Sequence, residues 1–299
     1  MKHQLKEITS CPICEHKTFK SFIKCKDHNF SNDVFTIVEC DRCSFKFTNP
    51  RPTPETLHLY YQNDNYISHT SSKKGVFNKV YHLVRQYQFG YKWNIIKKNV
   101  SNKNSLRLLD FGCGTGEFIH YCKQKNATVF GVEKDDGARS LAIKNYQLNV
   151  KKELSDFNEN FDVITLWHVL EHIEDFKSLL IKLKKLLNDD GIIILGLPNN
   201  NSYDAKNYQE NWVAYDVPIH LSHFTKADIL KLVEEFSFTS LISKPLFFDA
   251  YYISMLSAKK SGKQFLSGLQ TVSKACGSLT SQLIILNSFS SLNSVDGKN

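Results

Sequence analysis

The second half of the sequence predicts a doubly wound α/β fold. From Leu106 onward, short apolar runs alternate with segments in which Leu and Ile recur at helical spacing. The apolar runs are continuous, which is typical of parallel strands that helices bury on both faces. A loop with three glycines follows the first run, at the kind of strand end where such folds bind ligands. Together these observations predict a Rossmann-like sheet with its functional site at the carboxyl ends of the strands.

Each element of this sheet is placed by its own pattern. The predicted strands cover residues 106–111, 128–133, 148–150, 161–167, 191–197, 238–244 and 281–287. The predicted helices between them cover residues 116–125, 135–145, 176–187 and 226–236. We take residues 105–287 as one domain, and we expect the Ser/Asn-rich end, residues 288–299, to be disordered.

Two Cys-x-x-Cys pairs mark the N-terminal segment. Cys11 and Cys14 form the first pair, and Cys40 and Cys43 form the second. Thiolates three residues apart can bind one metal ion from a single turn, so two pairs supply the four ligands of a tetrahedral zinc site. We therefore predict a small zinc ribbon over residues 1–50 with a structural Zn²⁺, and strands at 35–40 and 44–50.

The N-terminal segment also leaves alternatives open. Because the pairs stand 25 residues apart, Cys25, His16 and His28 remain possible replacements for one ligand. A disulfide framework is the competing interpretation, but the N-terminus has no apolar stretch that would act as an export signal. No run approaches the ~18 apolar residues of a membrane span. We therefore expect a cytoplasmic protein.

Residues 51–104 connect the two units and carry a net charge of +7 out of the +8 of the whole chain. Prolines end the ribbon, and residues 76–98 follow the pattern of a long amphipathic helix interrupted by Gly90. A solvated, Lys-rich helix face is the simpler interpretation of the charge. A contact surface for an anionic substrate, nucleic acid or a membrane surface is the alternative.

The glycine loop predicts a binding site for a small ligand with a positively charged part. Gly112, Gly114 and Gly116 in "LLDFGCGTGEF" permit a tight turn and let a ligand approach the backbone. Their spacing differs from the G-x-G-x-x-G of dinucleotide sites. Asp110 stands ahead of the loop, where it would repel a pyrophosphate but favour an ammonium or a sulfonium. Glu133 ends the second strand, where a carboxylate can accept hydrogen bonds from both ribose hydroxyls.

These residues resemble the first two motifs of the class I S-adenosylmethionine-dependent methyltransferases. The stretches "FDVITLWHVLEHIED" and "DDGIIILGLPN" are similar to the fourth- and fifth-strand motifs of that family. The resemblance covers about residues 90–287 and implies a seven-stranded sheet with S-adenosylmethionine as methyl donor. It further implies that Asp110 and the three glycines hold the methionine part, that Glu133 holds the ribose, and that Asp156 lies near the adenine.

Histidines follow the fourth and fifth predicted strands. Methyl transfer is an in-line displacement, so the protein must align a nucleophile and often remove its proton. We predict that His220 or His223 is the general base, and we favour His220 because Pro218 fixes the backbone just before it. Tyr66, His69 and His168 are the next candidates, and we expect His172 to help cap the helix that follows.

The whole arrangement is similar to a subset of bacterial methyltransferases with an N-terminal zinc-binding segment. Some of these methylate a nucleotide sugar at carbon, and others act on small molecules or cell-surface polysaccharides. By that resemblance, Tyr66, Ser68 and His69 reach over the active site. We expect an acceptor other than a deoxysugar nucleotide, because residues 1–299 show no counterpart of the extra C-terminal domain of the sugar C-methyltransferases.

Three functions fit the sequence. The first is O- or C-methylation of a small-molecule or glycan-precursor acceptor, which the histidine loop favours. The second is RNA methylation, with the ribbon and the basic connector holding the RNA. It is weakened because "WHVLEH" stands where base-methylating enzymes carry an Asn-Pro-Pro-Tyr-like motif. The third is a protein that binds S-adenosylmethionine without turnover.

Overall fold

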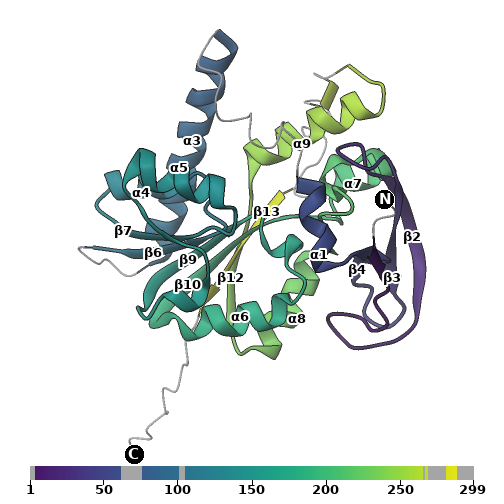
Figure 1. Cartoon of the computed structure of the whole chain (residues 1–299), viewed down its shortest axis with the longest axis horizontal. Helices are drawn as coiled ribbons and strands as arrows, with labels where there is room; N and C mark the ends of the chain where they lie inside the picture. The colour runs from purple at the N-terminus through teal and green to yellow at the C-terminus, as the bar shows by residue number, and fades with distance from the viewer. Residues whose placement is uncertain (1–3, 62–75, 101–104, 265–266, 269–280, 288–299) are drawn as a thin grey trace, which may run out of the picture.

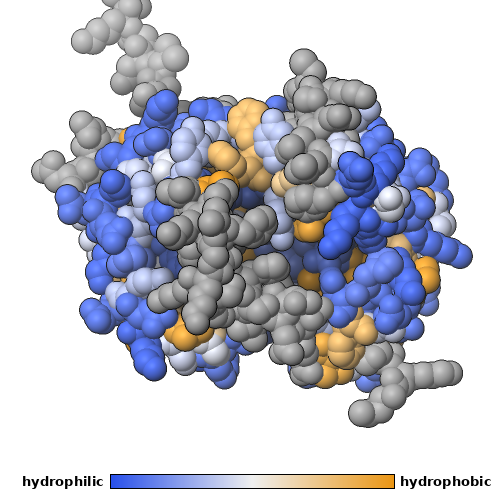
Figure 2. All heavy atoms as spheres, turned by 90° about the horizontal axis from the view of Figure 1, so that it is seen from above, coloured by the Kyte–Doolittle hydropathy of each residue, from blue (hydrophilic) through white to orange (hydrophobic). Residues whose placement is uncertain are grey.

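A central β-sheet lies between two helical layers, and the N-terminal strands pack to one side of it (Figure 1). This computed structural model describes residues 4–61, 76–100, 105–264, 267–268 and 281–287. On the face seen in Figure 2, most of the described surface is hydrophilic, with small hydrophobic spots that are separate from one another.

The sheet has seven strands in the order β12–β13–β10–β9–β6–β7–β8. They are β6 (Arg107–Phe111), β7 (Thr128–Val132), β8 (Asn149–Lys151), β9 (Phe161–Trp167), β10 (Leu187–Pro198), β12 (Thr239–Pro245) and β13 (Ser281–Asn287). All seven predicted strands are confirmed, but β13 runs antiparallel to both of its neighbours, so the sheet is mixed. The strand order reverses between β6 and β9, and the carboxyl ends of such strands are where these folds bind ligands.

Helices cover both faces of this sheet. The four predicted helices are confirmed as α4 (Glu117–Gln124), α5 (Asp136–Tyr146), α6 (Phe176–Lys185) and α8 (Lys226–Glu235). The sequence analysis missed α7 (Tyr203–Tyr208) and α9 (Phe247–Lys260). Short 3₁₀ turns fill the loops: η2 (Leu154–Asp156), η3 (Leu170–His172), η4 (Gln209–Asn211) and η5 (Val213–Tyr215).

Alternate residues of each strand enter opposite cores, as the two-residue period of a strand requires. Leu108 and Ile194 belong to the core that contains residues of α3, α4 and α5. Leu109 and Ile193 belong to the core that contains residues of α6 and α8. Figure 1 shows the same division, with α4 and α5 on one side of the sheet and α6 and α8 on the other.

The N-terminal segment, residues 4–52, is here named the cysteine module. Its strands are β1 (Leu5–Lys6), β2 (Phe19–Lys26), β3 (Val34–Cys40), β4 (Lys46–Thr48) and β5 (Arg51–Pro52). A strand from the other half of the chain, β11 (Ser222–His223), completes a four-stranded sheet of order β11–β4–β3–β2. Phe45 lies with its ring centre 6.1 Å from that of Phe176 and 5.5 Å from that of Phe224. The module therefore shares its hydrophobic core with α6, although a domain boundary at residue 50 stays a prediction.

The connector begins with α1 (Pro54–Leu57) and η1 (His58–Tyr61). The following α3 (Val76–Asn99) passes through Gly90 without a break, so the predicted interruption is wrong. One helical glycine costs only about 1 kcal/mol relative to alanine, and buried neighbours such as Phe89 and Ile96 hold the helix on the sheet.

Among the described part of residues 51–104, two basic side chains are paired with carboxylates, and one of them, Arg51 of β5, is buried. Arg51 is 4% exposed and lies 3.2 Å from the Glu174 carboxylate, and Arg85 pairs with Glu117. Tyr66, Ser68, His69 and the C-terminal tail lie outside the described residues. Within the described part of the chain, no helix combines the length and apolar character needed to cross a bilayer.

Candidate active site

The glycine loop connects β6 to α4, and all three glycines adopt backbone angles that favour glycine. The φ angle is +77° at Gly112, +54° at Gly114 and +79° at Gly116. A Cβ atom at Gly112 would lie 2.5 Å from Val169, and one at Gly116 would lie 2.5 Å from Leu148. A Cβ atom at Gly114 would meet nothing within 4 Å. Gly112 and Gly116 therefore permit close packing, whereas the backbone at Gly114 is open to a ligand.

Glu133, which follows β7, holds this loop from the neighbouring strand. One carboxylate oxygen accepts the Gly114 N–H at 2.8 Å, and the other accepts the Asp135 N–H at 2.8 Å. An ionised carboxylate can accept about four hydrogen bonds, so both oxygens retain capacity for further donors such as hydroxyls. The structure thus brings the predicted ribose-binding acid into direct contact with the most open point of the loop.

Asp110 and Lys92 are two buried titratable groups, and each influences the pKa of the other. Asp110 is 3% exposed and accepts a hydrogen bond of 2.5 Å from the Thr165 hydroxyl. Burial raises the pKa of Asp110 to about 7, although Thr165 and Lys92 oppose that shift. The Lys92 ammonium lies 4.1 Å from the centre of the Trp167 ring, and burial lowers its pKa. A buried acid beside a buried amine suits a ligand that carries both charges, such as an α-amino acid group.

Asp156 lies at the end of η2 and is exposed. Its carboxylate accepts the Glu153 N–H at 3.2 Å in a capping box, so the residue organises its own turn. The next residue, Phe157, is buried with its ring edge-on to Phe130 and Phe161. Contact between Asp156 and an adenine stays a prediction.

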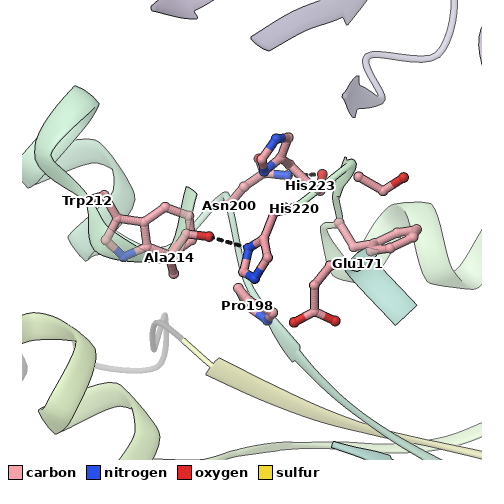
Figure 3. Close-up of a pocket in the computed structure, with 9 residues that line it drawn as sticks. Glu171, Pro198, Asn200, Trp212, Ala214, His220 and His223 are labelled. Carbon is pink, nitrogen blue, oxygen red and sulfur yellow. Dashed lines mark hydrogen bonds between the residues drawn. The ribbon is translucent and has the colours of Figure 1, made fainter. Parts of the chain in front are cut away.

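His220 lies in a closed cluster with Glu171 (Figure 3). The Ala214 carbonyl can only accept, so the Nδ1 of His220 carries a proton and donates to it at 2.9 Å. Burial lowers the pKa of His220, although Glu171 opposes the shift, so the ring is neutral near pH 7. Its Nε2 is therefore an available proton acceptor, and the ring lies between Ala214 and the Glu171 carboxylate in Figure 3.

His223 has a different set of contacts. The Thr48 hydroxyl donates to the His220 carbonyl at 2.7 Å, so it has no proton left for the ring of His223. The contact of 3.1 Å between Thr48 Oγ1 and His223 Nε2 is therefore donated by the ring. Burial holds the pKa of His223 well below its ordinary value. Since its Nε2 is engaged in the interior, His223 is placed to support the loop rather than to meet an acceptor.

Glu171 is the charged centre of the cluster. It is 1% exposed, and neither carboxylate oxygen has a hydrogen-bond partner among the described residues. Burial would raise the pKa of Glu171, but His168, His220 and His172 lower it overall, so it stays ionised. The positive charge paired with Glu171 is the His168 ring, whose Nδ1 lies 3.5 Å from a Glu171 oxygen.

His168 and His172 both lie close to this carboxylate. The other ring nitrogen of His168 lies 3.0 Å from Asp249 of α9. Burial lowers the pKa of His168, but Asp249 and Glu171 raise it more, to about 9. His172 Nδ1 contacts the Tyr61 hydroxyl at 3.0 Å and the Ile219 carbonyl at 3.1 Å. The expected capping role of His172 is wrong, because Asp175 provides the N-cap of α6.

The cluster has the donor types of a metal site but little free space. Glu171, His172 and His220 each bring one potential ligand atom within 4.8 Å of the others. The cavity beside Glu171 and His220 has a volume of about 10 Å³, which is room for about one water molecule. A separate groove of about 650 Å³ lies at the same edge of the sheet, lined by residues that include Asn199, Lys226 and Lys244. In this arrangement an acceptor does not fit beside His220 without a displacement of the loop.

The four predicted zinc ligands converge in the cysteine module. The Sγ atoms of Cys11 and Cys43 lie 3.5 Å apart, those of Cys14 and Cys40 lie 3.6 Å apart, and all four lie within 4.8 Å of one another. Sulfurs that share a tetrahedral Zn²⁺ at about 2.3 Å are expected about 3.8 Å apart. The cysteines are not paired in disulfides. This donor set fits zinc.

Both pairs adopt the same local turn. The N–H of Cys11 donates to the carbonyl five residues on, as does that of Cys40, and the residue after each pair is left-handed. The possible substitutes lie elsewhere: Cys25 belongs to a separate hydrophobic cluster, and His16 contacts the hydroxyl of Thr18 at 2.7 Å. Among the described residues, neither of them nor His28 joins the cysteine cluster.

The sheet order, the open glycine loop and the acid after β7 define a class I S-adenosylmethionine-dependent methyltransferase. Residues 85–243, more than half of the chain, match the family described as "Methyltransferase domain". The chain belongs to this family, and it is an enzyme that uses S-adenosylmethionine as methyl donor.

Curated relatives match the chain over part of its length. A ubiquinone biosynthesis O-methyltransferase of Azorhizobium caulinodans is 32% identical over 103 residues, covering 31% of this chain and 41% of the relative. A protein of the same name from Haemophilus ducreyi is 30% identical over 135 residues, covering 40% of this chain and 56% of the relative. The chain thus spans about half the length of these relatives.

Solved structures share the fold at low sequence identity. The magnesium protoporphyrin IX methyltransferase of Synechocystis PCC 6803, with bound SAH, has a TM-score of 0.51 and 14% identity, covering 78% of this chain and 99% of that one. The plantazolicin methyltransferase BpumL, in complex with SAH, has a TM-score of 0.51 and 17% identity, covering 77% of this chain and 93% of that one. These likenesses support the fold alone.

Sequence reasoning missed four groups of this site: Lys92, Glu171, Asp249 and Thr48. Lys92 stands in a basic helical segment and looks solvent-exposed there. Asp249 lies on α9, which was not predicted. Glu171 was visible in "WHVLEH" beside the histidines, and a carboxylate between two histidines was the one signal that could have singled it out.

Proposed function

We propose that the protein methylates an oxygen or an acidic carbon of a small-molecule acceptor, with His220 as the proton acceptor. The observation that carries this proposal is the state of the His220 ring. Its Nδ1 proton is committed to Ala214, its Nε2 is free to accept, and the ionised Glu171 carboxylate lies within 4.8 Å. That carboxylate stabilises the imidazolium that forms when the ring takes a proton.

The chain's own residues supply binding and alignment. Asp110 and Lys92 would hold the ammonium and carboxylate of the methionine part, Glu133 would accept the ribose hydroxyls, and Gly114 would let the donor lie against the backbone. When bound, S-adenosylmethionine supplies a methyl group already activated by its sulfonium. His220 would take the acceptor's proton once the loop has moved to admit the acceptor.

We also propose that Cys11, Cys14, Cys40 and Cys43 hold one structural Zn²⁺. The support is the convergence of four sulfurs on two turns of the same geometry. Because the module's core continues into α6, metal binding would stabilise more than the ribbon itself.

The test is an acceptor screen with the full-length protein and S-adenosylmethionine. Purified protein is incubated with a panel of phenols, carboxylic acids, nucleotide sugars and a mixed RNA pool, and products are read by mass spectrometry for one added methyl group. A methylated small molecule whose formation stops in His220→Ala supports the proposal. Methylation of RNA alone, with a steep salt dependence of binding, would replace it with the RNA alternative.

A further inference from the structure

The cysteine module contacts the loop that carries the candidate base, and one of its residues, Thr48, forms hydrogen bonds with both histidines of that loop. β4 pairs with β11 so that Phe47 lies opposite Ser222 and Lys46 lies opposite His223. The Thr48 N–H, at the end of β4, donates to the Leu221 carbonyl at 3.1 Å. The loop that carries His220 is therefore a strand partner of the cysteine module and not an isolated loop of the catalytic domain.

The Thr48 hydroxyl serves both histidines of this loop. It donates to the His220 carbonyl at 2.7 Å and accepts from the His223 ring at 3.1 Å, and the residue is 0% exposed. Its donor and acceptor capacity are thus both used in a site that water does not reach. Removal of this hydroxyl leaves a buried carbonyl and a buried ring N–H without partners, which the loop can relieve only by moving.

Because of the remaining contacts of the loop, such a movement would displace His220 as well. The His220 N–H donates to the Asp216 carbonyl at 3.0 Å, and the Leu221 N–H donates to the Glu171 carbonyl at 2.9 Å. With Thr48 in place, the backbone at His220 is held on both sides and its ring is held by Ala214. Without the Thr48 hydroxyl, no side chain of the cysteine module among the described residues bonds to His220.

We infer that Thr48 of the cysteine module is a positioning residue for His220, and that the module thereby forms part of the catalytic site. The expected effect on turnover rests on the proposed role of His220 as the base. The positioning of the His220 ring by Thr48 does not rest on that role. A misplacement of a reacting group by about 1 Å can cost about 10²-fold in rate. Thr48 itself touches neither donor nor acceptor.

The first test needs no acceptor. Full-length protein with ¹⁵N-labelled histidine is examined by imidazole NMR across pH, with His220→Ala and His223→Gln used to assign the two rings. In the wild type, we expect His220 to carry its proton on Nδ1 and His223 on Nε2. In Thr48→Val, the His220 resonances should shift and broaden, and Thr48→Ser should restore them. His220 resonances in Thr48→Val that coincide with the wild type at every pH would overturn the inference.

The second test measures turnover with the acceptor that the screen identifies. We expect Thr48→Val to lower kcat about 10- to 100-fold, with the Kd for S-adenosylmethionine within about twofold of wild type, and Thr48→Ser to recover most of the rate. The matched control is Thr18→Val, because Thr18 also contacts a histidine ring but is exposed, and its hydroxyl bonds to His16 of the same module and not to the loop. Parallel losses of Tm, donor affinity and kcat, without rescue by serine, would mean that Thr48 only holds the fold.

The two proposals fail separately. If His220→Ala retains turnover, His220 is not the base, yet the NMR result still shows whether Thr48 fixes its ring. If His220→Ala loses turnover while Thr48→Val keeps both wild-type resonances and wild-type kcat, the base stands and the positioning role falls.

Discussion

The glycine loop and the histidine cluster lie at the same edge of the sheet, but they are built in opposite ways. The loop and its acid come from β6, α4 and β7, which are consecutive in the chain, and the loop is open at Gly114. The cluster joins η3, the loop before β11, Tyr61 of the connector and Thr48 of the cysteine module. It is closed around a space for about one water molecule.

This difference assigns separate tasks to the two regions. An open loop with left-handed glycines can bind a ligand without rearrangement. This suits the methyl donor S-adenosylmethionine, which binds in every turnover. A closed cluster of buried titratable groups, tied together from distant segments, controls protonation and specificity instead. Variants in the first region should therefore change donor affinity, and variants in the second should change rate at constant donor affinity.

Replacement of the base should give the largest effect. His220→Ala is expected to lower kcat by about 10²- to 10⁴-fold, because the acceptor's proton loses its destination. Calorimetric titration with S-adenosylmethionine should give a Kd close to that of the wild type, since His220 makes no described contact with the glycine loop.

His223→Gln is the matched control for this variant. Glutamine keeps an N–H for Thr48, so turnover should stay within about threefold of wild type while Tm falls slightly. Near-wild-type turnover in His220→Ala would remove the assignment of His220 as the base.

Loss of a cysteine ligand should test whether the cysteine module binds zinc and whether the metal stabilises the protein. Metal analysis of the wild type is expected to give one zinc equivalent per chain, and Cys14→Ser should lose most of it and lower Tm, because metal binding and folding are coupled. Cys25→Ala is the control, since Cys25 is buried in a different cluster. A full metal equivalent retained in Cys14→Ser would show that other residues bind it.

The third prediction concerns the open region. Glu133→Ala removes a carboxylate that holds the Gly114 N–H and would receive two hydroxyls, so donor binding should weaken by roughly 2–3 kcal/mol, or about 30- to 150-fold in Kd. Gly114→Val should weaken binding at least as much, because valine is strained at a φ of +54° and fills the open space. Calorimetric titration measures both. An unchanged Kd in both variants would contradict the assignment of this edge to the donor.

The sequence predicted the part of the molecule that depends on local pattern. Continuous apolar runs were enough to find the inner strands β6, β7, β9, β10 and β13, because burial on both faces favours apolar residues at successive positions. The edge strands β8 and β12 contain polar residues and were found from their place in the strand–helix alternation. The helix α9 was missed, because aromatic, serine and alanine residues such as those around Ala250 give no clear apolar stripe. The antiparallel direction of β13 was missed as well, since direction is set by the connection and not by the strand's own residues.

For the site, the same distinction holds residue by residue. Asp110, Gly114 and Glu133 were found because each stands at a fixed offset from a strand end. The sequence favoured His220 over His223 because of Pro218, and the role of either as base stays a prediction. The contacts that distinguish the two rings involve the Thr48 hydroxyl, which lies 172 residues away in sequence from His220. The burial of Lys92 and of the Glu171 carboxylate depends on packing between distant helices and turns, which no local motif encodes.

The smallest effect should come from the pH dependence of donor binding. The pKa of Asp110 is raised to about 7 by burial, so this carboxyl is partly protonated near neutral pH in the free protein. Binding of an ammonium beside it favours the ionised form, so the complex holds fewer protons than the free enzyme and affinity rises with pH. We expect the Kd for S-adenosylmethionine to fall by no more than about 10-fold from pH 6 to pH 7.5. Titrations in buffers of different ionisation enthalpy should show a released proton, and Asp110→Asn should abolish both the release and the slope. An equal slope in Asp110→Asn would assign the pH dependence to another group, such as Lys92.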